Sequence, residues 1–523
     1  MFPVTLSLAS CVLSEPSSVA PSSAEGELLF VRDGVVLPGG EAGTALPDGR
    51  RLLSRSWSPG ETVSVGSWSG TAPAQAECIA MYAVPLGDVS RLVAMGGAAP
   101  NTTLAFSPDG ALLAVGSYRG EVLLLDGWTG DVLARRALAE TMVKSVAWSP
   151  DGTTLYAAEQ SPDAFVHAMD PADLTARWSL RLADIVESSA APDAEDLYGV
   201  YRLPAAYGLE VLPDGDLIIA AHHNWKVDGE TVNRSQLLRL SPDGQIVAQW
   251  PETVADARLR HPRVDVESGQ VALSVVRSAA GPDPADLPVG GVAVLSLSDL
   301  SLIQSVVPDP LGPYFTRASV WEGLDVSASG VFLGLTDGRI QLYGSDGALA
   351  LEEATGAPIL AGEVPIHASV GWGFFHGDGV VFSTSNTLIP YGAQTQAHRP
   401  PSLHPGENTL WSLGLDGAPR WLWSGPQILD GMTRSDDGAH LVVAAGDRQT
   451  DARRDLYGAL IFDLSDPEGR RSGVERLEAF CPTQGPTFYA AAMSADGRVA
   501  MAEYPYLDED SAVVGEYRVM VMR

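Results

Sequence analysis

The sequence has few basic residues, few cysteines and no long apolar run. It carries 33 Lys and Arg against 65 Asp and Glu, for a formal net charge of −32, and only Lys144 and Lys226 are lysines. A chain with this surplus of negative charge repels phosphate backbones, so nucleic acid is not an expected partner. No run of 18 or more apolar residues occurs, so we expect no membrane-spanning helix.

Three cysteines exclude a dense disulfide framework. Cys11 ends a Leu-Ala-Ser-Cys segment that resembles a bacterial lipobox, and a Ser/Pro/Ala/Glu-rich stretch follows it. We therefore expect residues 1–25 to be a lipoprotein-type leader and flexible tether, with lipidation at Cys11 as the protein's attachment to a membrane. The leader is short and has no Lys or Arg before Arg32, so a disordered tail is the alternative.

The other two cysteines, Cys78 and Cys481, lie near opposite ends of the remaining chain. If the fold brings these ends together, the two can form a disulfide in an oxidising compartment. Two unrelated buried thiols are the alternative.

Glycine and proline are abundant, with 54 Gly and 37 Pro, and many of them belong to one recurring phrase. An apolar run is followed by Ser-Pro-Asp-Gly or a weaker copy and then by a second apolar run. Proline sets φ, aspartate bonds its own backbone and glycine takes the positive φ, which predicts a strand, a tight turn and an antiparallel strand. The copies cover residues 105–117, 147–158, 211–221, 266–275, 326–335, 376–384, 435–445 and 494–503.

A hairpin repeated about every 40 to 60 residues is typical of β-propeller blades. We predict an all-β fold, a β-propeller of four-stranded antiparallel blades that is closed by pairing of N- and C-terminal strands. The spacing favours eight blades, with seven and nine as alternatives. Residues 26–523 are expected to form this single domain, and residues 26–100 to be its N-terminal closing or degenerate blade segment.

Several predicted strand ends carry a family resemblance. Residues 168–178 keep the Ala, Asp and Trp of the Ala-x-Asp-x-x-Thr-Gly-x-x-x-Trp repeat, and residues 240–250 and 413–421 are partial copies. From about residue 50 onward the chain thus resembles WD40-like, quinoprotein-like and YVTN-type propellers. These motifs imply a blade and no particular activity.

Long connections fall on one predicted face of the propeller, and the short Asp-Gly turns fall on the other. Because ordered loops on a rigid scaffold commonly carry binding sites, we expect binding on the face with the long connections. These connections cover residues 183–206, 222–236, 277–290, 308–318, 383–408, 446–458 and 504–515.

The position eight residues before each turn glycine starts the first strand of a blade, at the predicted mouth of the central channel. It is polar in most repeats, which suggests a ring that binds a small ligand or a peptide loop. The alternative is a set of edge residues that solvate a water-filled channel. The predicted ligand-binding residues are Lys144, Tyr207, His261, Glu322, Asp430 and Tyr489.

Catalytic motifs are missing from the sequence. It has no vicinal cysteine pair of the kind found in pyrroloquinoline-quinone dehydrogenases, no Gly-x-Ser-x-Gly and no His-Glu-x-x-His. Its loop histidines lack metal-ligand spacing and are expected to be solvated, so we predict no metal and no cofactor, and assign no catalytic residue. A generic resemblance to arylsulfotransferase-like propellers implies loop histidines at the site. The histidines that this resemblance indicates are His222, His223, His261 and His404. If the protein is an enzyme, these are to be tested together with the channel-mouth residues Lys144 and Glu322.

Two functions remain open. We favour a non-catalytic, monomeric β-propeller of the bacterial cell envelope, lipid-anchored or secreted, that binds a protein or small-molecule ligand through its elaborated face. The alternative is an enzyme with a channel-mouth active site, related to quinoproteins, lactonases or arylsulfotransferases.

Overall fold

The fold was described from a computed structural model. It describes residues 26–31, 44–45, 51–57, 62–65, 68–71, 76–78, 80–94, 102–190, 199–277, 287–310, 320–356, 358–361, 364–384, 404, 406–424, 428–435, 437–446, 457–467, 471, 473–508 and 510–523. The predicted leader, residues 1–25 with Cys11, lies outside the described residues.

The described strands pair into eight successive four-stranded antiparallel units. Units 1 to 4 are β8 (Thr103–Phe106), β9 (Leu112–Gly116), β10 (Glu121–Asp126) and β11 (Val132–Ala137); β12 (Met142–Trp148), β13 (Leu155–Gln160), β14 (Phe165–Met169) and β15 (Ala176–Arg181); β16 (Ala205–Val211), β17 (Leu217–Val227), β18 (Glu230–Leu240) and β19 (Ile246–Ala255); and β20 (Ala257–Asp265), β21 (Gln270–Arg277), β22 (Gly291–Ser296) and β23 (Leu302–Val306).

Units 5 to 8 are β24 (Val320–Ser327), β25 (Gly330–Leu335), β26 (Arg339–Tyr343) and β27 (Leu349–Ala354); β30 (Val370–His376), β31 (Gly379–Thr384), β32 (Thr409–Gly414) and β33 (Pro419–Ser424); β34 (Ile428–Arg434), β35 (His440–Gly446), β36 (Gly458–Asp463) and β37 (Leu477–Pro482); and β38 (Thr487–Met493), β39 (Val499–Glu503), β42 (Arg518–Met522) and β7 (Ala80–Pro85).

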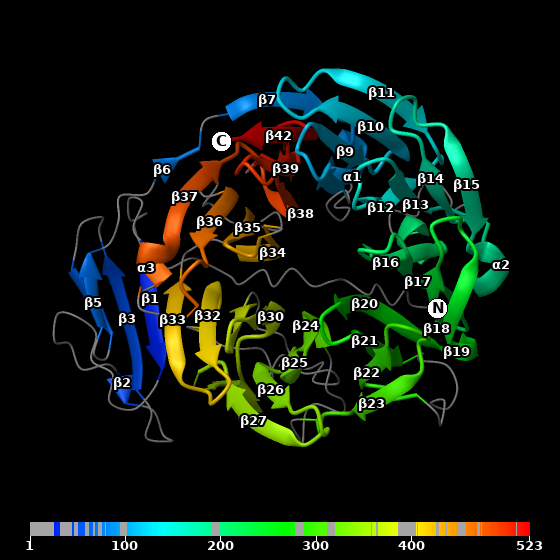
Figure 1. Ribbon diagram of the computed structural model, residues 1–523. Coiled ribbons are helices and arrows are strands. Elements are labelled where there is room, and N and C mark those ends of the chain that lie inside the picture. Colours follow the sequence, from blue (N-terminus) through cyan, green and yellow to red (C-terminus); the bar gives the residue numbers. More distant parts are fainter. Residues whose placement is uncertain are drawn as a thin grey trace.

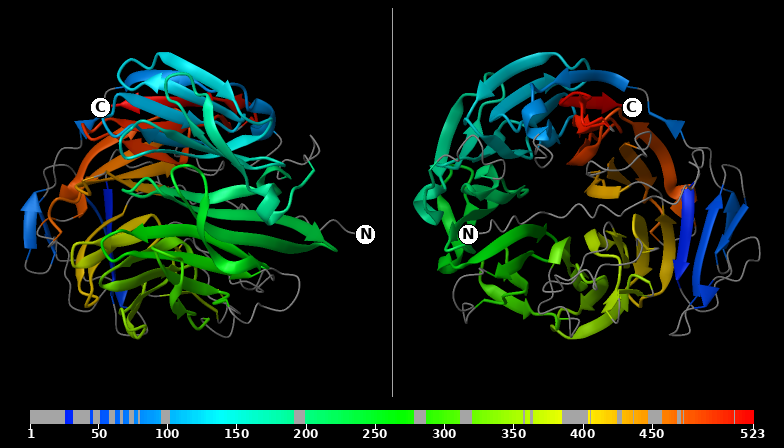
Figure 2. Two further views of the ribbon diagram at one scale, coloured as in Figure 1. Left: turned by 45° about the vertical axis from the view of Figure 1, so that its right-hand side comes forward. Right: turned by 180° about the vertical axis from the view of Figure 1, so that it is seen from behind.

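The units are arranged in a closed ring with their first strands innermost (Figures 1 and 2). The first strands β8, β12, β16, β20, β24, β30, β34 and β38 contact one another in this order, and β38 contacts β8. Such a ring of radial antiparallel sheets is a β-propeller. The predicted fold class is therefore confirmed.

Short elements connect or flank the units. The helices are α1 (Ser90–Ala94), α2 (Ala183–Val186), η1 (Gly199–Arg202) and α3 (Gly473–Arg476), and the small hairpins pair β28 (Ile359–Ala361) with β29 (Val364–Ile366) and β40 (Tyr506–Leu507) with β41 (Val513–Val514). The N-terminal strands are β1 (Gly26–Val31), β2 (Thr44–Ala45), β3 (Arg51–Trp57), β4 (Thr62–Val65), β5 (Trp68–Thr71) and β6 (Ala76–Glu77). Of these, β1 pairs with β33 at the outer edge of unit 6. No helix among the described residues is long and apolar enough to cross a membrane.

Closure of the ring joins an N-terminal strand to the C-terminal strand of the chain. β7 pairs antiparallel with β42 as the outer strand of unit 8, as predicted. Just before β7, Cys78 forms a disulfide with Cys481 of β37, with the Cα atoms 4.7 Å apart. The backbone N–H of Cys78 also donates to the carbonyl of Phe480. The segment that completes unit 8 is therefore also fixed to unit 7.

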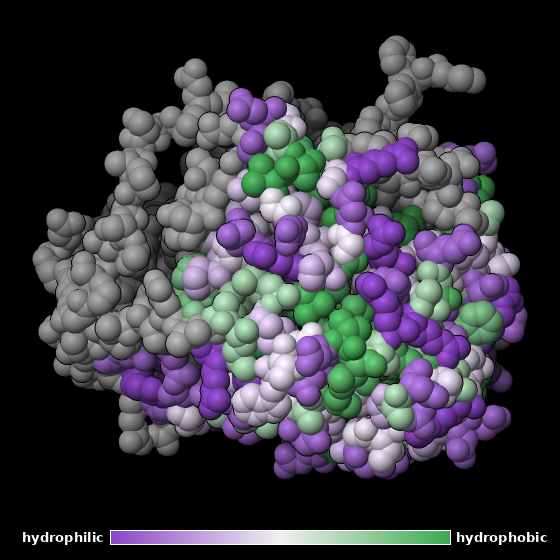
Figure 3. All heavy atoms as spheres, turned by 90° about the horizontal axis from the view of Figure 1, so that it is seen from above, coloured by the Kyte–Doolittle hydropathy of each residue, from purple (hydrophilic) through white to green (hydrophobic). Residues whose placement is uncertain are grey.

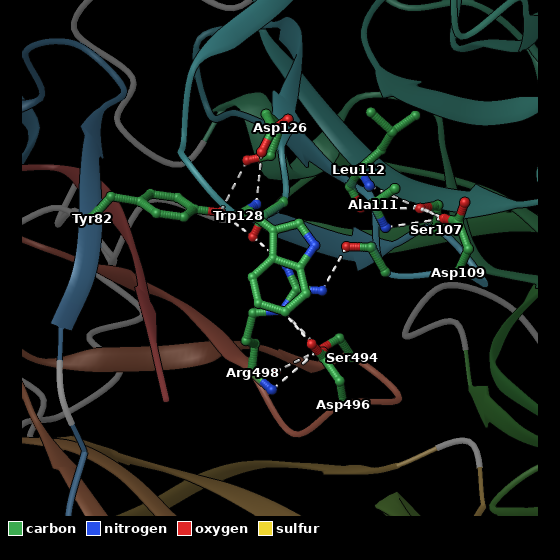
Figure 4. A network of polar contacts seen from close by, with 12 residues as sticks. Tyr82, Ser107, Asp109, Ala111, Leu112, Asp126, Trp128, Ser494, Asp496 and Arg498 are labelled. Carbon is green, nitrogen blue, oxygen red and sulfur yellow. Dashed lines mark hydrogen bonds and ion pairs between the residues drawn. The ribbon is translucent and has the colours of Figure 1, made fainter.

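Arg498 ties unit 8 to unit 1 (Figure 4). Its Nε donates to the Asp496 carboxylate at 2.9 Å, and its two other nitrogens donate to the carbonyls of Gly110 and Gly127 in two turns of unit 1. Its guanidinium carbon lies 3.7 Å from the ring centre of Trp128. All three nitrogens of this buried side chain thus have partners.

The recurring turns have the predicted chemistry. In the first copy, the Asp109 carboxylate accepts from the Ser107 hydroxyl at 2.6 Å and from the Ala111 N–H at 3.0 Å, and the N–H of Gly110 donates to the Ser107 carbonyl. Gly110 has a φ of +68°. The side-chain bonds of serine and aspartate recur at Ser149, Ser435 and Ser494.

The apolar core lies between neighbouring units. One cluster joins Val294 of unit 4 to Leu324 and Leu333 of unit 5, and other clusters join other pairs of neighbours in the same way. Each fully buried Leu or Val stabilises the fold by about 1.5–3 kcal/mol. Exposed apolar side chains lie on outer strands, as Val132 and Leu133 of β11 do. Seen from above, the surface carries a hydrophobic patch with hydrophilic residues around it (Figure 3).

One predicted loop is wrong. Residues 222–236 were expected to form a long connection, but β17 and β18 run through them as a hairpin of two eleven-residue strands, with pairing from Leu217↔Leu240 to Val227↔Glu230. The polar residues of this segment lack the apolar pattern of a buried strand, although α2 contacts both strands and η1 contacts β17. The hairpin still projects on the side opposite the Asp-Gly turns, beyond the start of β16, where Ala205 pairs with His222.

Candidate ligand-binding site

A β-bulge recurs near the start of the first strands, where the sequence predicted a polar ring. The regular pairing is interrupted in β12, β16, β20, β24, β30, β34 and β38. Lys144, Tyr207, His261 and Glu322 all lie inside these interruptions. A bulge bends the strand and re-aims a side chain, and it is common beside functional sites. The positions eight residues before the turn glycines therefore also differ from the rest of the strand in their backbone pairing.

Among the described residues at these polar positions, Tyr207 has the most contacts with cations. The Nζ of Lys144 lies 5.0 Å from its ring centre, and the guanidinium carbon of Arg258 lies 4.6 Å from it. Both distances fit cation–π contacts. Three consecutive units thus bring two cations to one aromatic ring.

The hydroxyl and the edge of Tyr207 are held by its neighbours. The hydroxyl donates to the Tyr201 carbonyl at 3.3 Å and accepts from Gln160 Nε2 at 3.4 Å. The His222 ring meets Tyr207 edge-on, with centres 4.7 Å apart. His222 Nε2 in turn lies 3.1 Å from Asn233 Oδ1, an acceptor, so this nitrogen donates. The ring is therefore fixed by contacts from both sides.

The next contact joins units 4 and 5. His261 Nδ1 lies 2.6 Å from Glu322 Oε1, and Arg263 Nη2 donates to Glu322 Oε2 at 2.9 Å. His261 has a φ of +51°, an unusual conformation for a residue other than glycine. Glu322 is 8% exposed, so its carboxylate is held between two partners away from water.

Charge and burial shift the pKa values of these groups. Burial lowers the pKa of His261 to about 4 against the opposing effect of Glu322. Burial raises the pKa of Glu322, but His261 and Arg263 outweigh this effect and lower it to about 2. At neutral pH we therefore expect the Glu322 carboxylate to accept a hydrogen bond from the neutral imidazole of His261.

The same balance acts around Tyr207. Burial lowers the pKa of Lys144, and Arg258 and Arg260 lower it further. Burial raises the pKa of the Tyr207 hydroxyl, but Arg258 and Lys144 outweigh it and the pKa falls below its usual value. Burial and Arg258 hold the pKa of His222 well below its usual value. Burial is the main cause of the lowered pKa of Lys144 and His222, and the neighbouring cations add to it, whereas at Tyr207 the cations outweigh burial.

We call this set the inner-strand cluster, and its members come from four consecutive units. They are Lys144, Gln160, Tyr207, His222, Arg258, Arg260, His261, Arg263 and Glu322.

Other predicted residues lie elsewhere. His223 points away from His222, as expected for neighbours in a strand, and its Nδ1 lies 3.1 Å from the Val186 carbonyl. His404 lies near His367, with ring centres 6.3 Å apart. The side chains of Asp430 and Tyr489 lie outside the described residues. The expected solvation of loop histidines is wrong for His222, His223 and His404, which are at most 3% exposed because neighbouring segments cover them.

Sequence reasoning missed the arginines of β20. The strand reads ARLRHPRVD, so Arg258, Arg260 and Arg263 surround His261 within a few positions. In a chain with few basic residues, this local concentration was a usable signal. Among the described residues, no group of three or more His, Cys, Asp and Glu side chains is placed to hold a metal ion.

The comparisons with known proteins add little beyond the fold. No family model and no curated protein matches the chain. Solved structures similar to it include the C-terminal WD40 domain of Sif2 (TM-score 0.48, 12% identity, covering 86% of this chain and 98% of that one) and BamB from Moraxella catarrhalis (0.44, 13%, 86% and 98%). A third is the dihydro-heme d1 dehydrogenase NirN in complex with DHE (0.43, 14%, 74% and 67%). These likenesses are too low to carry an argument. The assignment to the β-propeller class therefore rests on the ring of paired strands described above.

Proposed function

We propose that this chain is a non-catalytic β-propeller that binds a small-molecule ligand at the inner-strand cluster. The observation that carries the proposal is the recurring bulge, which takes Lys144, Tyr207, His261 and Glu322 out of regular strand pairing. Regular pairing alone gives no reason for such an interruption in successive units. Polar side chains converging on a buried aromatic ring are typical of small-ligand sites.

Retention of a ligand tests this proposal. The purified protein is dialysed against a bacterial metabolite extract, and the compounds that it retains are identified by mass spectrometry after denaturation. Wild type should retain at least one compound that Tyr207→Leu does not, because the substitution removes the ring that both cations contact. Tyr343→Leu, in unit 5, is the matched control and should behave as wild type. Retention of nothing by wild type, or equal retention by Tyr207→Leu, would contradict the proposal.

An enzyme is the second candidate, and the His261–Glu322 pair is the observation that favours it. A carboxylate that orients an imidazole is a common general-base arrangement, and the Nε2 of His261 is buried without a hydrogen-bond partner in the described part of the chain. The low pKa of His261 makes it a weak base at neutral pH, which is why we prefer binding. Turnover of a lactone or an aryl sulfate by wild type, lost in His261→Gln, would reverse this preference.

We also propose a location in the bacterial cell envelope, lipid-anchored through Cys11 or secreted. The Cys78–Cys481 disulfide supports this location, because such bonds persist in oxidising compartments. Intact mass measured on protein from the native membrane fraction tests it. A diacylglycerol-sized mass addition that disappears in Cys11→Ser is expected for the anchored form. An unmodified, fully reduced chain in the cytosolic fraction would overturn the proposal.

A further inference from the structure

As defined from the described residues, the inner-strand cluster holds four basic side chains and one carboxylate, Glu322. Lys144, Arg258, Arg260 and Arg263 contribute positive charge. Glu322 is bound to Arg263 and His261, and two further carboxyl groups of this region, Glu210 and Asp325, interact with Arg263. Within the described part of the chain, neither Lys144 nor Arg258 has a carboxylate at ion-pair distance.

Three other covered arginines of the described chain have such a carboxylate. Arg339 pairs with Asp337 at 2.8 Å, Arg498 with Asp496 at 2.9 Å and Arg518 with Glu503 at 2.6 Å. Removing a charge from water is costly unless it is paired, which explains these three pairs. The missing carboxylate at Arg258 distinguishes it from these three arginines.

Hydrogen-bonding capacity is also unused at this place. The Nε of Arg258, the Nδ1 of His222 and the Oε1 of Gln160 are buried and have no hydrogen-bond partner among the described residues. The Tyr207 ring faces the two cations, but an aromatic face accepts no conventional hydrogen bond from their N–H groups. N–H donors on Lys144 and Arg258 thus remain available. Two acceptors in the same cluster, His222 Nδ1 and Gln160 Oε1, also lack partners among the described residues.

We propose that the ligand of the inner-strand cluster carries an oxyanion, a carboxylate, sulfate or phosphate group, bound by Lys144 and Arg258 beside Tyr207. This inference rests on the proposed function and names the chemistry of the ligand. Charge-assisted bonds from lysine and arginine are the usual way to hold such groups. The net charge of the chain is −32, so the overall field repels anions and an anion must be bound by this local group of cations.

Isothermal titration with inorganic phosphate, sulfate and acetate at constant ionic strength tests the inference. Wild type should bind at least one of these anions saturably, and Lys144→Met and Arg258→Met should weaken that binding at least about tenfold. The matched control is Lys226→Met, which removes the other lysine, an exposed residue at the end of β17 bonded to Thr231. This variant should bind as wild type does. Equal weakening in Lys226→Met would show diffuse attraction and overturn the inference.

A second measurement uses the wild-type protein, so it does not depend on whether a variant folds. Reductive methylation with ¹³C-formaldehyde labels Lys144, Lys226 and the chain's amino terminus and keeps their positive charge. The Lys144 signal should shift saturably with the anion, whereas the Lys226 signal should not. If neither lysine signal responds to any of the three anions but the dialysis experiment finds a ligand that depends on Tyr207, the oxyanion inference fails and the proposed function stands. If dialysis finds no ligand either, both fail.

Discussion

Arg498 and Arg258 both contact aromatic rings inside the propeller, yet they differ in the hydrogen bonds that their guanidinium nitrogens make. Arg498 lies over Trp128, and its donors bind Asp496 and two carbonyls of unit 1. Arg258 lies over Tyr207 and has no carboxylate partner among the described residues, and its Nε is buried without a hydrogen-bond partner. A fully bonded cation stabilises the closure of the ring, whereas an incompletely bonded one is suited to hold something that arrives from solution.

The largest expected effect comes from removing the bonded cation. Arg498→Met leaves Asp496 and two carbonyls of unit 1 without their partner, so the free energy of unfolding should fall by about 3–5 kcal/mol. Arg258→Met, as the matched variant, should lower the free energy of unfolding by less than Arg498→Met does, because it leaves no carboxylate unpaired. Chemical denaturation followed by tryptophan fluorescence measures both. Equal losses for the two variants would remove the distinction between the sites.

The second effect concerns the covalent part of the closure. Reduction of Cys78–Cys481, or the double substitution to serine, should lower the free energy of unfolding by about 2–4 kcal/mol, since the bond restricts an unfolded chain across 403 positions. Anion binding at the inner-strand cluster should not change, because the disulfide lies between β37 and the segment before β7. The same denaturation and titration measurements apply. A loss of anion binding on reduction would show that the two regions are coupled.

The third effect is the pH dependence that His261 contributes; burial also lowers the pKa of His223 and His376 outside the cluster, so they add to the acid sensitivity with the same sign. The folded pKa of His261 is about 4, below its ordinary value of 6.5, so between these values the unfolded chain binds a proton that the folded chain does not. The contribution of His261 to the free energy of unfolding is therefore fully present above pH 6.5. It falls as the pH drops towards 4, by about 2 kcal/mol between pH 7 and pH 5. The charged groups facing His261 are Glu322, Arg260 and Arg263. The pKa of Glu322 is lowered to about 2, so its contribution is lost only below its ordinary value of 4.5 and not in this window.

Stability measured at pH 7 and pH 5 checks this dependence. His261→Gln should reduce the difference between the two values. Arg498→Met should lower both values by the same amount, because no group that it bonds titrates in this range. A wild-type difference that survives unchanged in His261→Gln would assign the acid sensitivity to another part of the molecule.

The sequence predicted the propeller because its information is local. Ser107, Asp109 and Gly110 define a turn within a few positions, and the turn's spacing predicts the ring. The same spacing located Lys144, Tyr207, His261 and Glu322, because each blade starts at the same distance from its turn. Local spacing could not show that Arg258 reaches the Tyr207 ring, or that Arg498 reaches Trp128, because these contacts cross between units. Local spacing also could not distinguish an arginine whose guanidinium nitrogens all have partners, such as Arg498, from one with a donor that has no partner among the described residues, such as Arg258.

The pairing of β7 with β42 has a consequence for synthesis of the chain. A ribosome produces the outer strand of unit 8 before it produces any complete unit, and that strand has no partner until β42 emerges. Units 1 to 7 each complete their four strands in order, but β7 must remain exposed during nearly all of translation. Exposed strand edges promote misassociation, so we expect β7 to be a site at which a nascent chain is prone to pair wrongly.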